Sequence, residues 1–363
     1  MSAAATERDV RPGDSVSSTR AQLLSAVRTL EPTELYLGPL GADELLVEVR
    51  ATGVCGSDRA AFLGTHPYKS APCVLGHELS GVVVQAGSAV REVAVGDSVA
   101  SAASAHCGRC TECARGAANL CANKTSLSHG GWHGSFAERV VLRERMIVRL
   151  PDGLTAEAGA LVEPLAIGVH AAALVGDRRP HNVVVLGCGT IGLATLMAAR
   201  AGGAQHVLCV DRGAVKGDLA RRAGASAYVD SRAVPSVVRA VLDAVAGPVD
   251  VTFVAAGYEG VVDDAVAVTR PGGAVVLVSY FDGAPQVDLN AVVARGITVV
   301  GSALCTVTDL ARAVASLVDG EVDPTVLITH KFPLDQAQVA LELMVADGET
   351  VGKIMLTPGG GRD

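Results

Sequence analysis

The chain has 363 residues and a formal net charge of −8, from 38 acidic and 30 basic residues. Hydrophobic residues make up 49% and charged residues 19%, so the chain can bury a sizeable core and is not disordered by composition. The length predicts two domains, or one large domain with an insertion. Because the balance is acidic and no local basic cluster stands out, a nucleic-acid or anionic-membrane surface is not expected.

The N-terminal residues 1–20 are predicted to form a mobile tail. Charged residues at positions 7–9 stand where a signal peptide needs an apolar core. The longest uncharged stretch, 180–199, contains a glycine pair and changes from strand to helix periodicity, which argues against a membrane span. Without a secretion signal, a cytoplasmic location is expected, and the nine cysteines are expected to be thiols or metal ligands.

Short alternating apolar runs, separated by glycines, extend from Leu45 to Arg149 and predict half-buried antiparallel strands. From about Ala166 strands and helices alternate; for example, the apolar run 183–186 precedes a helical stretch over 190–201. This alternation predicts a parallel sheet covered by helices, and from about Ala303 the elements are mixed again. The prediction is an α/β protein in which a β-rich domain (21–165 and 303–363) is interrupted by a doubly wound parallel-sheet domain (166–302).

Four of the nine cysteines lie within fifteen residues, in the lobe 106–122. They form a C-x2-C-x2-C-x7-C run and are Cys107, Cys110, Cys113 and Cys121. Four thiolates at this spacing can surround one tetrahedral Zn²⁺ and leave no position for a substrate, so a structural zinc is predicted. An iron–sulfur cluster is the main alternative, but the C-x2-C-x2-C-x3-C-P spacing is not present.

A second candidate metal site draws its residues from separated segments. The candidates are Cys55, His77, Glu78 and Glu163. Each residue alone fits a structural role equally well. Together, a cysteine, a histidine and one or two carboxylates make the three-ligand set of a catalytic zinc with one open position. Asp58 is placed to hydrogen-bond the other imidazole nitrogen of His77, and the hydroxyl of Ser57 could take a proton from an alcohol at the open position.

A glycine motif, Gly187-x-Gly189-x-x-Gly192, stands between a predicted strand and a predicted helix. The first glycine permits the tight turn, the second lets a pyrophosphate approach the backbone, and the third lets the helix meet the strand. The N-terminus of the helix, with Ile191 in its first turn, then stabilises the phosphates. The motif therefore predicts a dinucleotide site.

Asp211 ends the next predicted strand. Its carboxylate would accept hydrogen bonds from the adenosine ribose and repel a 2′-phosphate, which favours NAD over NADP. Arg212 follows directly and could instead accommodate that phosphate. Lys216 lies where a basic residue could face the adenine side. A solvated helix start explains Arg212 and Lys216 equally well.

The chain resembles the zinc-containing medium-chain dehydrogenases from about Leu45 to Leu356. The resemblance is carried, in the order and spacing of that family, by CGSD (55–58), GHE-x-x-G (76–81), the cysteine lobe, EPLA (163–166) and the glycine motif. It is closest to the sorbitol (polyol) and butanediol dehydrogenase branch, with threonine dehydrogenase nearby. It implies a GroES-like catalytic domain, an inserted Rossmann domain, two zinc ions per chain and NAD, with NADP as the alternative.

The resemblance also implies roles for single residues. In that family the residues matching Cys55, His77 and Glu78 hold the catalytic zinc, and the residue matching Glu163 lies within reach, so either glutamate is a candidate ligand. The residue matching Ser57 begins a proton relay.

One position departs from the family pattern. The relay usually ends at a histidine five residues after the zinc cysteine, and this position is Ala60 here. The proton must then leave through water, the cofactor ribose or another group, such as His66 or Tyr68.

The expected function is hydride transfer between a secondary alcohol, of polyol, sugar or cyclitol type, and NAD(P). The alternatives are amino-alcohol oxidation of the threonine-3-dehydrogenase type and a non-catalytic dinucleotide-binding protein. A non-catalytic protein would keep the glycine motif but would be expected to have lost the ligands of the second metal site. The expected partner is a small alcohol or ketone, with no nucleic acid or membrane, and the resemblance suggests a homodimer or homotetramer. Candidate pocket positions are His66, Tyr68, Trp132 and His133, and the nicotinamide is expected near the strand ends 279–280 and 301–302.

Overall fold

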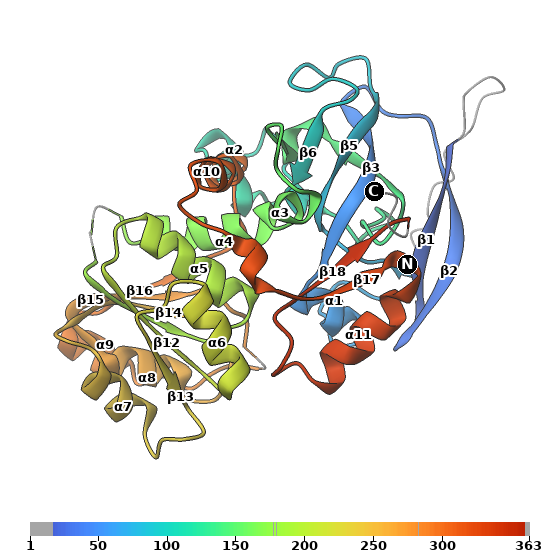
Figure 1. Ribbon diagram of the computed structural model, residues 1–363. Helices are drawn as coiled ribbons and strands as arrows, with labels where there is room; N and C mark the ends of the chain where they lie inside the picture. The colour runs from blue at the N-terminus through green and yellow to red at the C-terminus, as the bar shows by residue number, and fades with distance from the viewer. Residues whose placement is uncertain (1–16, 177, 179, 282, 360–363) are drawn as a thin grey trace. The chain divides into compact units, whose positions relative to one another are not determined.

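The computed structural model describes residues 17–176, 178, 180–281 and 283–359, which form two compact units (Figure 1). Unit 1 holds the described residues of Met1–Glu163, His330–Asp347 and Lys353–Asp363. Unit 2 holds those of Pro164–Thr329 and Gly348–Gly352. The chain therefore leaves unit 1 after Glu163, returns to it at His330 and later adds the short segment Gly348–Gly352 to unit 2.

Unit 1 is rich in β-structure. Its strands are β1 (Ser17–Ala26), β2 (Thr29–Leu37), β3 (Glu44–Val54), β4 (Cys73–Val74), β5 (Glu78–Ala86), β6 (Ser98–Ser101), β7 (Ser104–Ala105), β8 (Thr125–Ser126), β9 (Arg139–Arg143), β10 (Ile147–Arg149), β17 (Ile328–Pro333, which crosses the unit boundary) and β18 (Lys353–Thr357). Its helices are α1 (Gly56–Phe62), α2 (Thr111–Ala114), α3 (Ala156–Ala160), α11 (Ala337–Ala346) and the 3₁₀ turns η1 (Ala118–Leu120), η2 (Glu144–Met146) and η4 (Leu334–Gln336).

Strand β3 is the centre of unit 1. It lies in a seven-stranded sheet of order β10-β6-β5-β3-β18-β17, and β9 also pairs with it. Most of its residues are buried, because it has neighbours on both edges. In register, Gly53 lies opposite Glu78 of β5, and Val54 lies opposite Ile354 of β18. The register therefore brings Glu78 and the start of β18 to the end of β3, just before Cys55.

Unit 2 is a parallel sheet with helices on both faces (Figure 1). The strands are β11 (Asn182–Leu186), β12 (His206–Asp211), β13 (Ala227–Asp230), β14 (Val249–Val254), β15 (Thr269–Leu277) and β16 (Thr298–Gly301). The helices are α5 (Thr190–Ala201), α6 (Ala214–Arg222), α7 (Val237–Ala244), α8 (Val261–Val268), α9 (Leu289–Arg295), α10 (Val307–Val318) and the 3₁₀ turn η3 (Pro324–Leu327), and α4 (Val162–Ala173) begins at the unit boundary.

The strand order in this sheet is β13-β12-β11-β14-β15-β16, and every pair is parallel. In chain order within the unit this is 3-2-1-4-5-6, the order of dinucleotide-binding Rossmann sheets. The order reverses between β11 and β14, and ligands of such sheets bind at that point, outside the carboxyl ends of the strands. The predicted α/β fold with a doubly wound parallel sheet is therefore confirmed.

The N-terminal boundary needs a correction. The predicted tail, 1–20, overlaps the first strand, because β1 begins at Ser17 and pairs along its length with β2. Residues 1–16 lie outside the described residues. The β1–β2 hairpin escaped prediction because polar side chains, those of Thr19 and Gln22, are buried in it and hide the apolar alternation.

The return to the first domain was also placed too early. Residues 303–329 and 348–352, predicted to belong to the β-rich domain, pack within unit 2. His170 Nδ1 of α4 lies 2.9 Å from Asp309 Oδ2 of α10, and η3 packs against α5 and α6. A helical period shows that a segment has an apolar face but not which core receives it. The assignment of catalytic and cofactor-binding roles to the two domains stays a prediction.

The α10 cap gives a pH-dependent prediction. Asp309 is buried, and its Oδ2 accepts hydrogen bonds from Thr306 N (2.9 Å) and Thr306 Oγ1 (2.7 Å) besides its contact with His170. Burial raises the pKa of Asp309, but the hydrogen bonds from His170 and Thr306 outweigh burial, so the net pKa is lowered. A lowered folded-state pKa contributes stability above the unfolded pKa of about 4, and this stability is lost as the pH falls through the folded pKa.

We expect Asp309→Asn to destabilise unit 2 by about 1–3 kcal/mol at pH 7, because a buried charged acceptor is lost. The penalty should shrink at about pH 3.5, where the unfolded carboxyl is mostly protonated. Melting temperatures of the wild type and the variant at the two pH values measure both effects. An equal difference at both pH values would contradict the lowered pKa.

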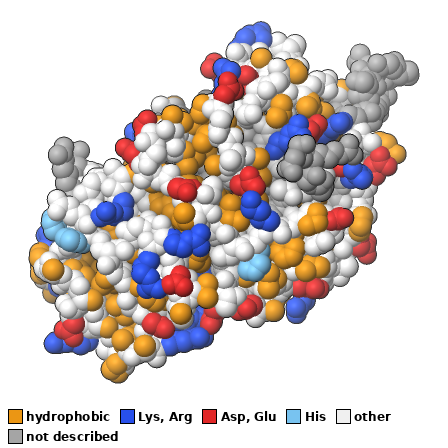
Figure 2. Space-filling view, viewed as in Figure 1, with side chains coloured by type: hydrophobic (Ala, Val, Ile, Leu, Met, Phe, Trp, Pro, Cys, Tyr) orange, Lys and Arg blue, Asp and Glu red, His pale blue; other side chains and the backbone are white. Residues whose placement is uncertain are grey.

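None of the described helices is long and apolar enough to cross a membrane. On the face shown in Figure 2, the Lys and Arg side chains of the described residues are interspersed with Asp and Glu rather than gathered into one basic surface. The cytoplasmic location stays a prediction.

Candidate active site and metal centres

Cys55 lies at the junction between β3 and α1. It is the N-cap residue of α1, with extended backbone angles (φ −92°, ψ 156°). Asp58, the third residue of the helix, accepts a hydrogen bond from Cys55 N at 3.1 Å through Oδ2. This capping arrangement satisfies a backbone donor that the helix start leaves free, and it fixes the backbone that carries the thiol.

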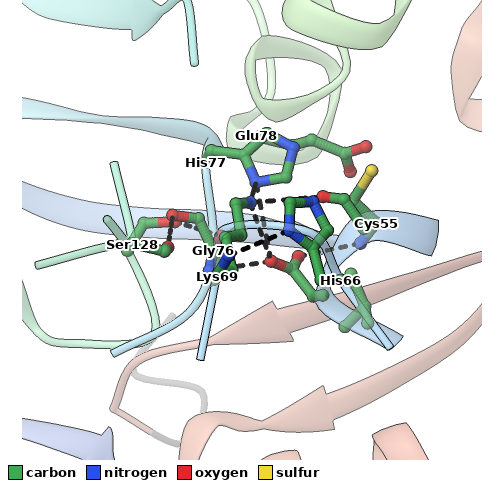
Figure 3. A network of polar contacts seen from close by, with 12 residues as sticks. Cys55, His66, Lys69, Gly76, His77, Glu78 and Ser128 are labelled. Carbon is green, nitrogen blue, oxygen red and sulfur yellow. Dashed lines mark hydrogen bonds and ion pairs between the residues drawn. The ribbon is translucent and has the colours of Figure 1, made fainter. Parts of the chain in front are cut away.

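Three predicted ligands meet at this junction. One ligand atom each from Cys55, His77 and Glu78 lies within 4.8 Å of the others. His77 and Glu78 are buried at the start of β5, while Cys55 is half-buried (Figure 3). A thiolate, an imidazole and a carboxylate are the donor types of a zinc site that keeps one position for water or substrate. The donor set and its spacing therefore fit a catalytic zinc ion.

The carboxylate of Glu78 is held by a lysine from the far end of the chain. Lys353 Nζ lies 2.8 Å and 2.5 Å from the two carboxylate oxygens and donates to Val54 O at 3.1 Å. Burial lowers the pKa of Lys353, but the charges of Glu78 and Cys55 outweigh burial and raise it, so the ammonium stays charged. A side chain at Gly53 would approach Glu78 Oε2 to 2.1 Å, so only glycine leaves room for this carboxylate.

Glu163 is not a member of this group of three ligand atoms. It lies in the first turn of α4 with 5% of its surface exposed. Burial raises its pKa to about 7; the charge of His77 lowers it, and that of Glu78 raises it. Burial therefore favours the neutral carboxyl of Glu163, and the charges of His77 and Glu78 act on it. The geometry thus groups Glu78, rather than Glu163, with the thiol and the imidazole.

Asp58 is fully buried and contacts Lys69, Gly76 and His77, three residues that Figure 3 labels. Its Oδ1 lies 3.6 Å from His77 Nδ1 and 3.7 Å from Lys69 Nζ, and it accepts a hydrogen bond from Gly76 N at 3.3 Å. Burial raises the pKa of Asp58, but the positive charges of His77 and Lys69 outweigh burial and lower it. The ionised carboxylate of Asp58 beside Nδ1 favours a proton on that nitrogen of His77 and leaves Nε2 for a metal.

Lys69 is the functional candidate that sequence reasoning missed. Its side chain is 6% exposed, and its Nζ donates to Ser57 Oγ at 3.2 Å and lies 3.4 Å from His77 Nδ1. The only local signal was a lysine eight residues before His77 in a chain with five lysines. Lys69 thus connects the predicted relay hydroxyl of Ser57 to the predicted zinc ligand.

The pKa of His77 is strongly raised. Burial and Lys69 lower its pKa, but the charges of Asp58 and Cys55 outweigh them and raise it to about 10. A metal ion and a proton therefore compete for this imidazole, because a histidine binds metal only through an unprotonated nitrogen.

Among the predicted pocket residues, His66 and Tyr68 contact each other, whereas Trp132 contacts other residues. His66 Nδ1 accepts backbone hydrogen bonds from Lys69 (3.0 Å) and Tyr68 (3.3 Å), so in the neutral ring the proton lies on the other nitrogen. The Tyr68 ring packs edge-on against His66, with centroids 4.4 Å apart. Trp132 instead donates its indole N–H to Val141 O, and the guanidinium of Arg143 lies over its ring. Burial lowers the pKa of His133.

The cysteine lobe forms a second cluster. The four sulfur atoms of Cys107, Cys110, Cys113 and Cys121 lie within 4.8 Å of one another. Cys107 N donates to Cys121 Sγ at 3.3 Å, and Arg145 of η2 donates to the carbonyl of Cys107. Backbone hydrogen bonds from Arg109 and Cys110 lower the pKa of Cys107 to about 6, which favours the thiolate that binds metal. Four converging sulfurs fit a closed, structural zinc.

The glycine motif of unit 2 joins β11 to α5, as predicted. A Cβ at Gly187 (φ +106°) would lie 2.8 Å from the carbonyl group of Ala255, and one at Gly192 would lie 1.9 Å from Gly187 O. A Cβ at Gly189, the N-cap of α5, would have no described protein atom within 4 Å. The helix N-terminus therefore faces open space, which fits a phosphate group. Ile191, in the first turn, uses its carbonyl to accept from Thr195 Oγ1.

Asp211 ends β12 and contacts the glycine turn. Its Oδ2 accepts from Cys188 N at 2.5 Å, and its Oδ1 accepts from Arg212 N at 2.7 Å. Lys216 is 7% exposed and donates to Val351 O at 2.6 Å. The alternative that its side chain is solvated at the start of a helix is therefore wrong. The side chain of Arg212 is 59% exposed, as expected for a solvated residue at the start of a helix.

The predicted nicotinamide region holds an unsatisfied group. Ser302 Oγ, just after β16, is buried and has no hydrogen-bond partner among the described residues. Ser279 Oγ donates to Ala256 O, and Tyr280 is 93% exposed. A buried hydroxyl without a partner calls for a polar ligand or water, so the carboxyl edge of the sheet fits a polar cofactor.

Two family models and several known proteins match this chain. Residues 41–152 match the family model of the alcohol dehydrogenase GroES-like domain, and residues 190–319 match that of the zinc-binding dehydrogenase. The chain is 33% identical to a sorbitol dehydrogenase of Arabidopsis thaliana, over 88% of this chain and 89% of that protein. It is 31% identical to an L-idonate 5-dehydrogenase of Vitis vinifera, over 92% and 93% of the two chains.

A solved structure has the same fold. A protein from Sinorhizobium meliloti 1021, assigned as a zinc-binding dehydrogenase and bound to NADP, superimposes with a TM-score of 0.86 at 33% identity. The match covers 94% of this chain and 100% of that one. Fold, site and relatives together define an NAD(P)-dependent zinc alcohol or polyol dehydrogenase. The chain belongs to the zinc-containing medium-chain branch of the alcohol dehydrogenase superfamily.

Proposed function

We propose that the chain oxidises a secondary alcohol of the polyol, sugar or cyclitol class with NAD, at the site formed by Cys55, His77 and Glu78. The observation that carries the proposal is the convergence of these three ligand atoms within 4.8 Å. The sorbitol and L-idonate dehydrogenases among the relatives support a hydroxylated substrate. They favour this class over a threonine-type amino alcohol and over a non-catalytic dinucleotide-binding protein.

The metal ligands are proposed to be Cys55, His77 and Glu78. When bound there, zinc supplies a Lewis acid that lowers the pKa of a coordinated hydroxyl by several units. Asp58 orients the imidazole of His77, and Lys353 neutralises part of the carboxylate charge of Glu78.

Ser57 is proposed to receive the hydroxyl proton. Lys69 occupies one lone pair of Ser57 Oγ, which leaves another lone pair to accept from the substrate and the Ser57 proton to be passed on. With Ala60 at the usual relay position, the next acceptor is water or the cofactor ribose, because His66 Nδ1 accepts backbone hydrogen bonds and the other ring nitrogen then carries the proton.

Unit 2 is proposed to bind NAD. The open space at Gly189 and the N-terminus of α5 would take the pyrophosphate, and Asp211 would bind the adenosine ribose. The orphaned hydroxyl of Ser302 would satisfy a polar group of the nicotinamide.

The test is a screen of secondary alcohols, polyols and cyclitols, with threonine included, followed by the absorbance of reduced nicotinamide. Turnover of at least one polyol or cyclitol with NAD is expected, in a protein that contains two zinc ions per chain. Prolonged chelation should lower the rate by at least about 10³-fold, because the Lewis acid supplies several kcal/mol of transition-state stabilisation. Oxidation of threonine alone would support the amino-alcohol alternative, and tight NAD binding without any turnover would support the non-catalytic one.

A homodimer or homotetramer is also proposed. Strand β16 ends the parallel sheet, and Val299 on it is 40% exposed. Leu289 and Val293, on the preceding helix α9, are 68% and 79% exposed. An open strand edge beside exposed apolar side chains favours association between copies. Analytical ultracentrifugation measures the assembly, and a monomer at micromolar concentration would contradict it.

A further inference from the structure

A cluster of charged side chains surrounds the carboxyl end of β12 in unit 2. Asp211 lies in register with Asp230 of β13, so Arg212 and Arg232 follow the ends of two adjacent strands. Glu349 belongs to the segment Gly348–Gly352, which packs with unit 2 although unit 1 resumes directly after it. The cluster therefore combines two strand ends with a segment that is distant in sequence.

Glu349 contacts both arginines. Its Oε1 lies 2.6 Å from Arg232 Nη2 and 3.7 Å from Arg212 Nη1. The side chains of Arg212, Arg232 and Glu349 are 59%, 56% and 41% exposed, so solvent and ligands reach them. The two guanidinium groups are thus shared by one carboxylate at the molecular surface.

The position of the cluster relative to the cofactor site follows from Asp211. Its carboxylate binds the backbone of the glycine turn, and in Rossmann sheets the residue at this point binds the adenosine ribose. A 2′-phosphate on that ribose would lie beside Asp211, within reach of side chains that follow β12 and β13. Arginine is the side chain best suited to a phosphate, because its fork of N–H donors matches the phosphate oxygens.

We propose that Glu349 is a cofactor-specificity residue, which disfavours a 2′-phosphate by occupying Arg212 and Arg232 and by adding a second negative charge near Asp211. This inference rests on the proposed use of NAD and deepens it. Two carboxylates balance two guanidinium groups, so an incoming 2′-phosphate meets no net positive charge from these four residues. Lys216, the other nearby cation, is buried and bound to Val351 O, so it does not replace them.

Glu349→Gln tests the proposal in the full-length, zinc-loaded protein. The variant removes one negative charge and frees both arginines. NADP binding should tighten about five- to tenfold, while the Kd for NAD should change less than about twofold, since NAD has no 2′-phosphate. Isothermal titration calorimetry with each dinucleotide measures both constants without relying on turnover. The gain for NADP should decrease at high salt, because the charges are exposed.

Two further variants make the result specific. Glu342→Gln carries the same chemical change on α11 of unit 1, where Glu342 accepts from Gln338, and it should leave both Kd values unchanged. Glu349→Gln combined with Arg232→Met should lose most of the NADP gain, because one of the freed cations is removed.

The failure of this inference differs from the failure of the proposed function. Normal NAD binding with no gain in NADP affinity in Glu349→Gln would overturn the role of Glu349 and leave NAD use intact. A wild-type protein that binds neither dinucleotide would instead contradict the proposed function. An equal gain for NAD and NADP would also overturn the inference, because it would show a general charge effect rather than recognition of the 2′-phosphate.

Discussion

Replacement of Cys55 by alanine is expected to lower kcat/KM for alcohol oxidation by at least about 10³-fold while NAD binding is retained. The thiol is one of three ligand atoms that lie within 4.8 Å of one another, and the other two cannot complete a three-ligand zinc site. Loss of the Lewis acid removes several kcal/mol of transition-state stabilisation, which corresponds to this change in rate. The residues proposed to bind NAD are all in unit 2 and are unchanged.

Three measurements separate this loss from misfolding. Metal analysis should show a fall from two zinc ions per chain to one, calorimetry should give an NAD Kd within about threefold of the wild type, and the melting temperature should show a folded protein. The matched control is Cys73→Ala, since Cys73 is also a half-buried thiol of unit 1 but is not a member of either cysteine-containing ligand group. A Cys55→Ala protein that keeps two zinc ions and full activity would show that this thiol does not hold the metal.

Cys110→Ser is expected to remove the other zinc ion and to destabilise the cysteine lobe. Of the helices and strands, the lobe contains only the short elements α2 and η1, and most of its residues are exposed or half-buried, so its own apolar core is small. A structural zinc of this kind contributes folding free energy directly, about 10 kcal/mol or more in isolated zinc-binding peptides. In this chain we expect a loss of several kcal/mol and a fall in melting temperature of about 10 °C.

Limited proteolysis shows whether the destabilisation is local. Cleavage within 106–122 should become faster in Cys110→Ser, while cleavage elsewhere in unit 1 should change little. Cys73→Ser, the same substitution at a half-buried thiol outside the lobe, is the control. One zinc ion should remain per chain, and the protein should still bind NAD. An unchanged zinc content together with an unchanged cleavage pattern would contradict the structural-zinc assignment.

Local patterns predicted the fold well where a residue's neighbours in sequence decide its structure. The helix predicted over 190–201 is α5, and the preceding apolar run is β11, because the glycine motif marks the turn between a buried strand and a helix. The β1–β2 hairpin and the unit that receives 303–329 depend on packing partners, and local periodicity does not contain them. In both places the predicted boundary differs from the boundary in the structure.

The sequence by itself determined the chemistry that this chain offers. The four cysteines of the lobe lie within fifteen residues, and the glycines of the nucleotide turn lie within six, so short-range chain geometry alone brings each set together. The residue types at 55, 77, 78 and 163 also limited the second metal site to one thiolate, one imidazole and a choice between two carboxylates.

Only the tertiary structure decided how those groups are charged and neutralised. Strand register brings Lys353 to Glu78 across 275 residues, a separate loop brings Lys69 to Ser57 and Asp58, and the segment Gly348–Gly352 brings Glu349 to two arginines. Burial then makes these ion pairs obligatory at the metal site, because an unpaired charge in a low-dielectric interior is strongly unfavourable. Sheet pairing and packing bring such partners together, and no local sequence pattern predicts which residues will pair.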